Sequence, residues 1–357
     1  MKRIVIVVAL SVASSADLRG AAPTAEPIQG VLVGGRLLTP HLAGRAENRY
    51  FTSLMVVPLQ VDRPSQTLHM SVNVMNVVPV RWHVSHSRIW AIDGTSHREW
   101  VYRYELGEFL KGKAITPKMV GIDGTAGEEK CPNRDLVLDP LWDIRIRGQS
   151  SALEDQRFHY DIVPISRNEM VLFAMTNIPE DPADGTQART PRWSMRAFRS
   201  TWVFEKNAFE KNKPKEWQQG EWTTVGSFEV AFTEPFQALV KGEVYYFLTA
   251  SGKLYRTGPK PPRIFEPVWD DSKRPITHFL TDADADRTFL FCKPAKEGEP
   301  GVYFELGPKP EPKPYDLSKV KRSKADEPLK GILERARFLA DQKLLKNPEP
   351  PKDEKKP

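Results

Sequence analysis

Short runs of aromatic and β-branched residues, separated by turn residues, recur from about residue 50 to residue 306. Several of these runs alternate apolar and polar side chains, as in residues 228–232 (FEVAF). Alternation with period two is typical of a strand with one buried face, and the 31 prolines disfavour a mainly helical protein. The pattern predicts strands at 68–80, 81–92, 158–163, 170–175, 200–204, 227–232, 236–240, 243–249, 253–256, 276–280, 287–291 and 302–306.

The region 225–306 has the most regular pattern, with two three-strand meanders. The segment Gly252-Lys253-Leu254-Tyr255 aligns loosely with Gly301-Val302-Tyr303-Phe304, 49 positions later. That spacing resembles the blade period of β-propellers, about 40–50 residues. We therefore expect a mainly β protein whose body of short antiparallel strands is either an irregular β-propeller-like fold or a β-sandwich.

The chain continues into a proline- and lysine-rich segment, 307–325, which we expect to be an extended polyproline II spacer. Leu329, Ile332, Leu333, Ala336 and Leu339 then follow at helical spacing, which predicts an amphipathic helix over 326–346 that Pro348 ends. The helix can dock on the body, on a partner or on a membrane surface. Residues 347–357 are polar and proline-rich, so we expect a disordered tail.

The N-terminus combines a basic start, a short apolar run and small residues before Asp17. These features predict a signal peptide over 1–16 with cleavage near Ala16, and a secreted or periplasmic protein. No second apolar run is long enough to span a bilayer, so we expect no transmembrane anchor. The remaining regions are an N-terminal extension (17–48), a β-rich region (49–224) and the blade-like region (225–306).

The net charge of +6 comes from the ends of the chain. Residues 308–357 carry a net charge of +5, while residues 17–307 carry −1. Because nucleic-acid binding needs lysine and arginine clustered on the folded domain, the charge distribution excludes nucleic acid as an expected partner.

Asp282, Asp284 and Asp286 place three carboxylates at alternate positions, the spacing by which calcium loops converge oxygens on one cation. An EF-hand would then need glycine and glutamate where Arg287 and Lys293 stand, so that motif is absent. Two interpretations remain, a looser calcium turn and a solvated hairpin tip. We expect no bound cofactor unless this turn holds Ca²⁺.

Three further groups have the residue types of binding or cross-linking sites. His83 and His86, with His97 farther along, can hold zinc only if a turn or bulge brings them to one side. Cys131 and Cys292 either form a disulfide or are two separate buried thiols. Four tryptophans can stack on ligands or fill the core, at Trp193, Trp202, Trp217 and Trp222.

The sequence contains no nucleophile elbow, zinc-protease motif, P-loop or dinucleotide fingerprint, so catalytic residues remain unknown. We therefore expect a non-catalytic β-rich protein with a binding or scaffolding role in the cell envelope, its partner an envelope protein or a polysaccharide. Two alternatives remain open. One is a secreted polysaccharide hydrolase with acidic catalytic residues, and the other is a structural envelope protein with no small ligand.

Overall fold

The computed structural model describes residues 26–46, 49–73, 81–85, 88–94, 99–111, 118–119, 158–166, 169–176, 193–203, 218–219, 223–257 and 265–350. The strands of this part form five antiparallel units, numbered here 1 to 5 in chain order. Unit 1 contains β1 (Ile28–Val33), β2 (Arg36–Ala46), β3 (Arg49–Pro58) and β4 (Gln66–Asn73). Unit 2 contains β5 (Arg81–Ser85), β6 (Arg88–Gly94), β7 (Glu99–Glu105) and β8 (Lys118–Met119), with α1 (Leu106–Leu110) between β7 and β8.

The other three units follow the same up-and-down order. Unit 3 contains β9 (Phe158–Pro164), β10 (Glu169–Thr176), β11 (Ser194–Val203), β12 (Gln218–Gln219) and β13 (Thr223–Glu229), the last two both pairing with β11. Unit 4 contains β14 (Phe236–Lys241), β15 (Val244–Thr249), β16 (Leu254–Thr257) and β17 (Phe265–Trp269). Unit 5 contains β18 (Ile276–Asp282), β19 (Arg287–Cys292), β20 (Gly301–Glu305) and β21 (Lys313–Tyr315).

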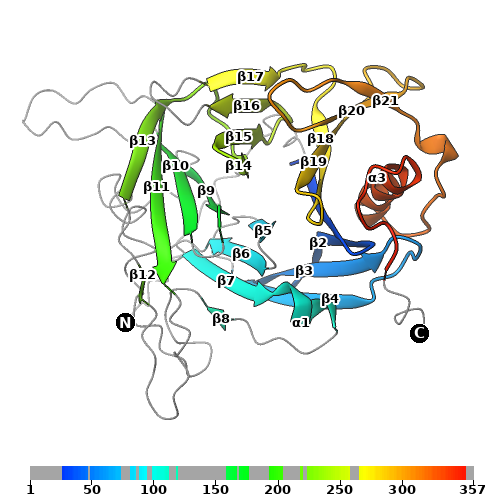
Figure 1. Cartoon of the computed structure of the whole chain (residues 1–357), viewed down its shortest axis with the longest axis horizontal. Coiled ribbons are helices and arrows are strands. Elements are labelled where there is room, and N and C mark those ends of the chain that lie inside the picture. Colours follow the sequence, from blue (N-terminus) through cyan, green and yellow to red (C-terminus); the bar gives the residue numbers. More distant parts are fainter. Residues whose placement is uncertain are drawn as a thin grey trace, which may run out of the picture.

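The units are arranged as a ring, and the chain colours run around it in order (Figure 1). The first strand of each unit is its inner strand: β9 contacts both β5 and β14, and β1 pairs with β18 in parallel. This parallel pair joins unit 5 to unit 1 in one eight-stranded sheet. Successive antiparallel units of four or five strands around a common centre make the body β-propeller-like, one of the two architectures that the sequence predicted.

The internal repeat in the sequence corresponds to equivalent strands. Leu254 and Tyr255 lie in β16, the third strand of unit 4, and their counterparts Tyr303 and Phe304 lie in β20, the third strand of unit 5. The 49-residue spacing therefore relates the third strands of two successive units.

Three regions differ from the sequence-based expectation. The expected N-terminal extension contains β1 and β2, joined by a turn in which Gly34 and Gly35 have φ of +51° and +72°. The single strand expected at 81–92 is a hairpin of β5 and β6. The expected spacer contains β21 and a short 3-10 helix, Leu317–Lys319. Pro314 is tolerated in β21 because this is an edge strand, where its missing N–H breaks no ladder.

The C-terminal amphipathic helix is confirmed as α3 (Leu329–Asp341), and it docks on the body. It ends earlier than expected because Lys343 takes a left-handed φ of +57°, which lets the N–H of Leu344 bond back to the carbonyl of Leu339. The helix packs between units 1 and 5 in one apolar core, which includes Leu32, Leu37, Leu280, Phe289, Phe291, Ile332, Leu333, Ala336 and Leu339.

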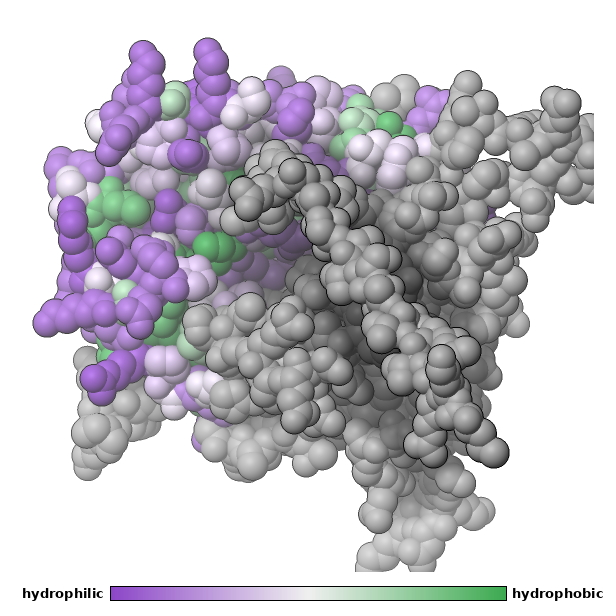
Figure 2. All heavy atoms as spheres, turned by 180° about the vertical axis from the view of Figure 1, so that it is seen from behind, coloured by the Kyte–Doolittle hydropathy of each residue, from purple (hydrophilic) through white to green (hydrophobic). Residues whose placement is uncertain are grey.

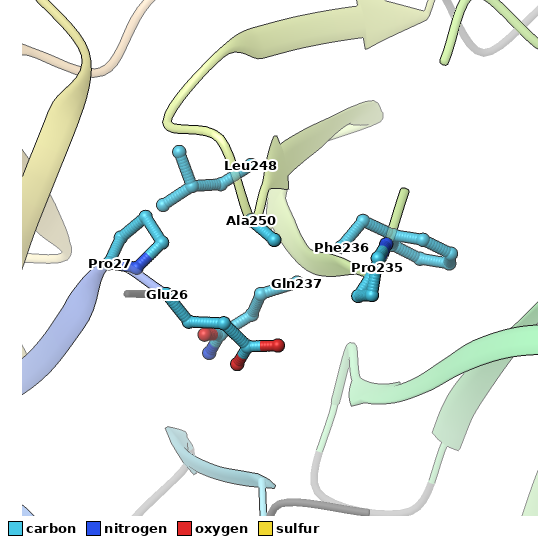
Figure 3. A pocket seen from close by; sticks show the side chains of 7 residues that line it. All are labelled: Glu26, Pro27, Pro235, Phe236, Gln237, Leu248 and Ala250. Atoms are coloured by element: carbon cyan, nitrogen blue, oxygen red, sulfur yellow. The ribbon is translucent and has the colours of Figure 1, made fainter. Parts of the chain in front are cut away.

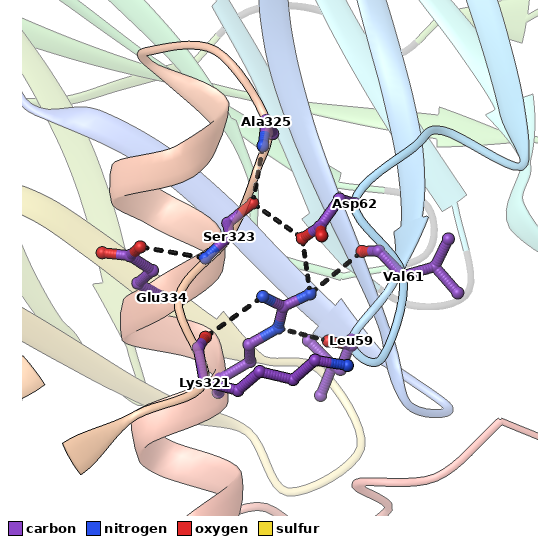
Figure 4. A network of polar contacts seen from close by, with 8 residues as sticks. Leu59, Val61, Asp62, Lys321, Ser323, Ala325 and Glu334 are labelled. Atoms are coloured by element: carbon purple, nitrogen blue, oxygen red, sulfur yellow. Dashed lines mark hydrogen bonds and ion pairs between the residues drawn. The ribbon is translucent and has the colours of Figure 1, made fainter.

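A buried guanidinium fixes α3 to the loop after β3. Arg337 is 3% exposed and donates to the carbonyl oxygens of Leu59, at 2.6 Å, and Val61, at 3.2 Å. It also pairs with Asp62 at 2.9 Å, and Asp62 accepts a second hydrogen bond from Ser323 (Figure 4). Within the part of the chain that is described, the helices are too short or too polar to cross a bilayer.

Candidate functional site

A pocket lies between the beginnings of two inner strands, β1 and β14 (Figure 3). Its empty volume is about 220 Å³, part of it open to solvent. Three segments line it: the chain entering β1, the loop entering β14, and the end of β15. The lining residues are Glu26, Pro27, Pro235, Phe236, Gln237, Leu248 and Ala250.

Two lining residues bring polar side chains into the pocket. Glu26 is exposed and presents a carboxylate, while Gln237 extends from β14 toward β1. The amide nitrogen of Gln237 donates to the side-chain oxygen of Gln29 at 3.1 Å. This bond fixes the Gln237 amide, so its own oxygen and second N–H can face a ligand. The pocket therefore offers carboxylate and amide acceptors together with an amide donor.

The opposite walls are apolar and held in place. Leu248 and Phe236 are each 2% exposed, and Pro27 and Pro235 present ring faces without N–H groups. The N–H of Ala250 donates to the carbonyl of Pro235 at 2.8 Å. Both carboxylate oxygens of Glu234 accept from Ser251, one from its N–H at 2.7 Å and one from its hydroxyl at 2.6 Å. These bonds fix the unit 4 side of the pocket before any ligand arrives.

A second polar group ties the inner strands together. Asp161 of β9 is fully buried, and one carboxylate oxygen accepts from the N–H of Ala238 in β14 at 2.8 Å. The other oxygen accepts from the N–H of Ile162 at 2.9 Å and lies 3.2 Å from Nε2 of His83 in β5. One carboxylate therefore connects units 2, 3 and 4 where their inner strands meet.

The three aspartates of the expected calcium turn are used in other contacts. Asp282, 1% exposed, accepts hydrogen bonds from the N–H groups of Asp284 and Lys346. Asp284 accepts from the N–H of Gly34 at 2.7 Å, and Asp286 occupies the left-handed region at φ +50°. No group of three metal-ligating side chains occurs among the described residues. The calcium turn stays a prediction, while the contacts that are seen anchor the C-terminal segment to the turn.

The remaining candidates are only partly within the described chain. His83 is paired with Asp161, whereas His86 and His97 lie outside the described residues, so the zinc site stays a prediction. Cys292 is a fully buried free thiol, and Cys131 lies outside, so the disulfide is also untested. Trp193 is half-buried and stacks on His159, with 5.6 Å between ring centroids, while Trp217 and Trp222 lie outside the described part.

No motif in the sequence contains Glu26 or Gln237, so neither residue was predicted to belong to a site. The one available signal was a pair of nearby prolines: Pro27 directly follows Glu26, and Pro235 stands two residues before Gln237, each at the entrance to an inner strand. The described part of the face turned away from Figure 1 is mostly hydrophilic, with small separate hydrophobic areas (Figure 2). Among the described residues, Val61 is the large apolar residue that is exposed, at 46%.

The comparisons with known proteins give distant structural likenesses. No protein-family model matches the chain, and no curated protein matches it. A fucose-specific lectin from Aleuria aurantia is 10% identical, with 84% of this chain and 81% of that chain covered and a TM-score of 0.36. Apo AztD from Citrobacter koseri is 12% identical, with 84% and 78% covered and a TM-score of 0.31. At these TM-scores the likenesses carry no argument, and the β-propeller-like class rests on the sheet topology above.

Proposed function

We propose that this chain is a non-catalytic carbohydrate-binding protein of the cell envelope, with the pocket between β1 and β14 as its ligand site. The observation that carries the proposal is the pairing of a carboxylate, Glu26, and a fixed amide, Gln237, with an apolar wall in one small hollow. Sugars present hydroxyl groups on their edges and C–H groups on their faces, so a site with both kinds of surface matches them.

The size of the pocket favours a small ligand. Sites for drug-sized molecules are enclosed clefts of about 300–1,000 Å³, whereas the 220 Å³ of this hollow includes space open to solvent, so it is a shallow depression. A sugar that lies against this depression with hydroxyl groups directed at Glu26 and Gln237 is a ligand of matching polarity. The described residues on the face shown in Figure 2 are mostly hydrophilic, so this face gives no comparable support for a large apolar partner.

The lining also favours binding over hydrolysis. Glycoside hydrolysis normally uses two carboxyl groups, one on each side of the scissile bond. Among the residues that line the pocket, Glu26 contributes the single carboxylate. The adjacent Glu234 has both oxygens engaged by Ser251, which holds it as a structural group.

The binding test uses the chain from Asp17 onward and a panel of neutral saccharides, including L-fucose and its methyl glycoside, measured by isothermal titration calorimetry. We expect at least one saccharide to bind, and Glu26→Gln and Gln237→Leu each to weaken that binding tenfold or more. Glu243→Gln is the matched control, because Glu243 is an exposed carboxylate in the turn between β14 and β15, outside the lining. Binding that both pocket variants leave unchanged would refute the site. Release of reducing ends, lost in Glu26→Gln, would instead establish the hydrolase.

Export is the second part of the proposal and rests on the N-terminal sequence. We expect the mature protein to begin at or near Asp17 and to fractionate outside the cytoplasm. N-terminal sequencing of the protein from fractionated cells tests this, and an intact Met1 on a cytoplasmic protein would refute it.

A further inference from the structure

We infer that two loops beside α3 form a basic docking surface for an acidic polysaccharide, a glycan chain that carries carboxylate groups. The loops are residues 59–65, after β3, and residues 319–324, before α3. The first lies at the end of β1 opposite to the pocket, because Pro58 pairs with Arg36, and Arg36 pairs with Val33, the last residue of β1. The inference goes beyond the proposed function, since it concerns a second surface that does not depend on the pocket.

The segment 319–324, called the basic loop here, is rich in exposed cations. It contains no acid, and its exposed side chains are those of Lys319, Lys321, Arg322 and Lys324. Within the described part of the chain, these four side chains form no ion pair. The other two residues, Val320 and Ser323, are 6% and 7% exposed and hold the loop on the body. Charge that the sequence placed on an extended spacer is therefore fixed on the folded surface.

Arg337 joins the basic loop to the loop after β3. Its guanidinium donates to the carbonyl oxygen of Val61 in one loop and to that of Lys321 in the other, each at 3.2 Å. The hydroxyl of Ser323 donates to Asp62 at 2.8 Å, a contact between residues 261 positions apart (Figure 4). These bonds hold the two loops side by side, so their exposed side chains belong to one surface.

The loop after β3 adds a fifth cation to this surface. Arg63 is exposed and directly follows Asp62, whose carboxylate is already paired with Arg337 at 2.9 Å. Because Arg337 compensates the charge of Asp62, the exposed cations keep their net positive charge. Lysine and arginine bind carboxylates through charge-assisted hydrogen bonds, but each exposed pair is weak, so useful affinity needs several pairs at once. A chain with a carboxylate on each sugar supplies them.

The acids that flank the basic loop favour a narrow partner. Asp316 precedes the loop, Asp326 and Glu327 follow it, and all three are exposed. A membrane of acidic lipids or a DNA duplex has a broad anionic face, which would repel these carboxylates while it met the cations. A single polysaccharide chain can follow the cations without covering the acids. Single-stranded nucleic acid stacks its bases on aromatic side chains, and residues 59–65 and 319–324 contain none.

The test measures binding of the chain from Asp17 onward to fluorescein-labelled alginate, a polyuronate, by fluorescence anisotropy. We expect alginate to bind, and an increase from 50 to 200 mM NaCl to weaken the binding about fivefold or more, because salt screens such pairs. The triple variant Lys321→Gln, Arg322→Gln, Lys324→Gln should weaken it at least tenfold. The matched control removes three charges elsewhere, in the loops after β17 and β19, and should weaken binding less than twofold. It combines Lys273→Gln, Lys293→Gln and Lys296→Gln, all at exposed lysines.

Absence of alginate binding would overturn the inference, as would equal weakening by the triple variant and its control, or an affinity that the triple variant leaves unchanged. Tight binding of phosphatidylglycerol vesicles or of DNA, with none of alginate, would also overturn it. Arg63→Gln should weaken alginate binding twofold or more, and an unchanged affinity would show that the loop after β3 is not part of the surface. The triple variant should leave neutral-saccharide binding unchanged, so this inference and the proposed function can fail separately.

Discussion

The carboxylate of Asp161 accepts a hydrogen bond from the backbone N–H of Ala238 at 2.8 Å, which links the inner strand of unit 3 to the inner strand of unit 4. The edge of an inner strand has N–H groups that its own sheet does not use, and Asp161 satisfies one of them. Its other oxygen accepts a hydrogen bond from the N–H of Ile162 and contacts His83. The Asp161 side chain links units 2, 3 and 4. The parallel pairing of β1 and β18 links units 5 and 1.

The first prediction concerns this carboxylate. Asp161→Ala would leave the buried N–H groups of Ala238 and Ile162 without their acceptor, and we expect it to lower the free energy of unfolding by about 3 kcal/mol. Asp270→Ala, which removes a 2.7 Å surface pair with Lys253, should cost less than about 1 kcal/mol. Urea unfolding of both variants measures the two values. Similar losses in both would show that Asp161 does not hold the inner strands.

The second prediction concerns the anchor of α3. Arg337→Met keeps the apolar part of the side chain but removes the donors to the carbonyls of Leu59, Val61 and Lys321. Breaking a buried charged contact of this kind costs about 3–5 kcal/mol, and we expect a loss in that range. The comparison is Arg199→Met, whose pair with Glu169 is half exposed and should contribute about 1 kcal/mol at most. Guanidinium unfolding gives both values, and a loss below 1 kcal/mol for Arg337→Met would contradict the anchor.

The third prediction is a pH dependence caused by His278. Burial, with a smaller contribution from Arg335, lowers the pKa of this histidine from 6.5 to about 2. Below pH 6.5 the unfolded chain takes up a proton that the folded protein does not, so the free energy of unfolding falls as the pH falls. Between pH 7 and pH 5 we expect His278 alone to account for a loss of about 2 kcal/mol.

His278→Gln isolates this contribution, because glutamine does not titrate. The variant should lose about 2 kcal/mol less than the parent protein between pH 7 and pH 5. Unfolding curves at the two pH values measure the difference. If the free energy of unfolding has the same pH dependence in parent and variant, the folded protein protonates His278 as readily as the unfolded chain does.

The fourth prediction concerns the close packing of α3 on β1. A methyl group at Gly30 would lie 2.6 Å from Leu280, 2.8 Å from Leu37 and 3.0 Å from Ile332. We therefore expect Gly30→Ala to destabilise the protein by about 1–3 kcal/mol through overpacking. Gly107→Ala is the matched control, because nothing lies within 4 Å of that position in α1, and alanine should stabilise the helix by about 0.5 kcal/mol. Thermal melts distinguish the two, and a neutral Gly30→Ala would contradict the packing of Ile332 on β1.

The fifth prediction concerns Cys292. Burial raises the pKa of this thiol to about 12, and the side chain is fully excluded from solvent. The thiolate is the reactive form, so iodoacetamide at pH 8 should leave Cys292 unlabelled in the native protein and label it after unfolding without reductant. Mass spectrometry of peptides reports both states. If labelling of the unfolded chain requires a reductant, Cys292 forms a disulfide.

The sequence predicted units 4 and 5 well because their strands are short, local and joined by tight turns. Gly242 and Gly252 take φ of +60° and +79° in turns that connect neighbouring strands, so a few adjacent residues define each hairpin. The strand β1 was missed for the opposite reason. Its interior is buried on both faces, with Val31 in one core and Leu32 in another, so period-two alternation is absent.

The candidate site could not be read from the chain in the same way. Gln29 and Gln237 are 208 residues apart, and only ring closure places their side chains in contact. The Asp282–Asp286 pattern adds a second example, because two of its carboxylates accept hydrogen bonds from the distant backbone N–H groups of Gly34 and Lys346, contacts that the spacing alone does not predict. Local spacing limits which oxygens can converge, while the surrounding segments determine what they bind.

The sequence by itself determined the elements whose energetics are local: the short strands of units 4 and 5, their glycine turns, the 49-residue repeat and the apolar stripe of the C-terminal helix. Only the tertiary structure decided what that stripe covers, how unit 5 meets unit 1, and which side chains share the pocket between β1 and β14. The physical reason is that a hairpin or a helical stripe depends on residues a few positions apart, whereas ring closure depends on contacts between distant segments, whose partners no local pattern specifies.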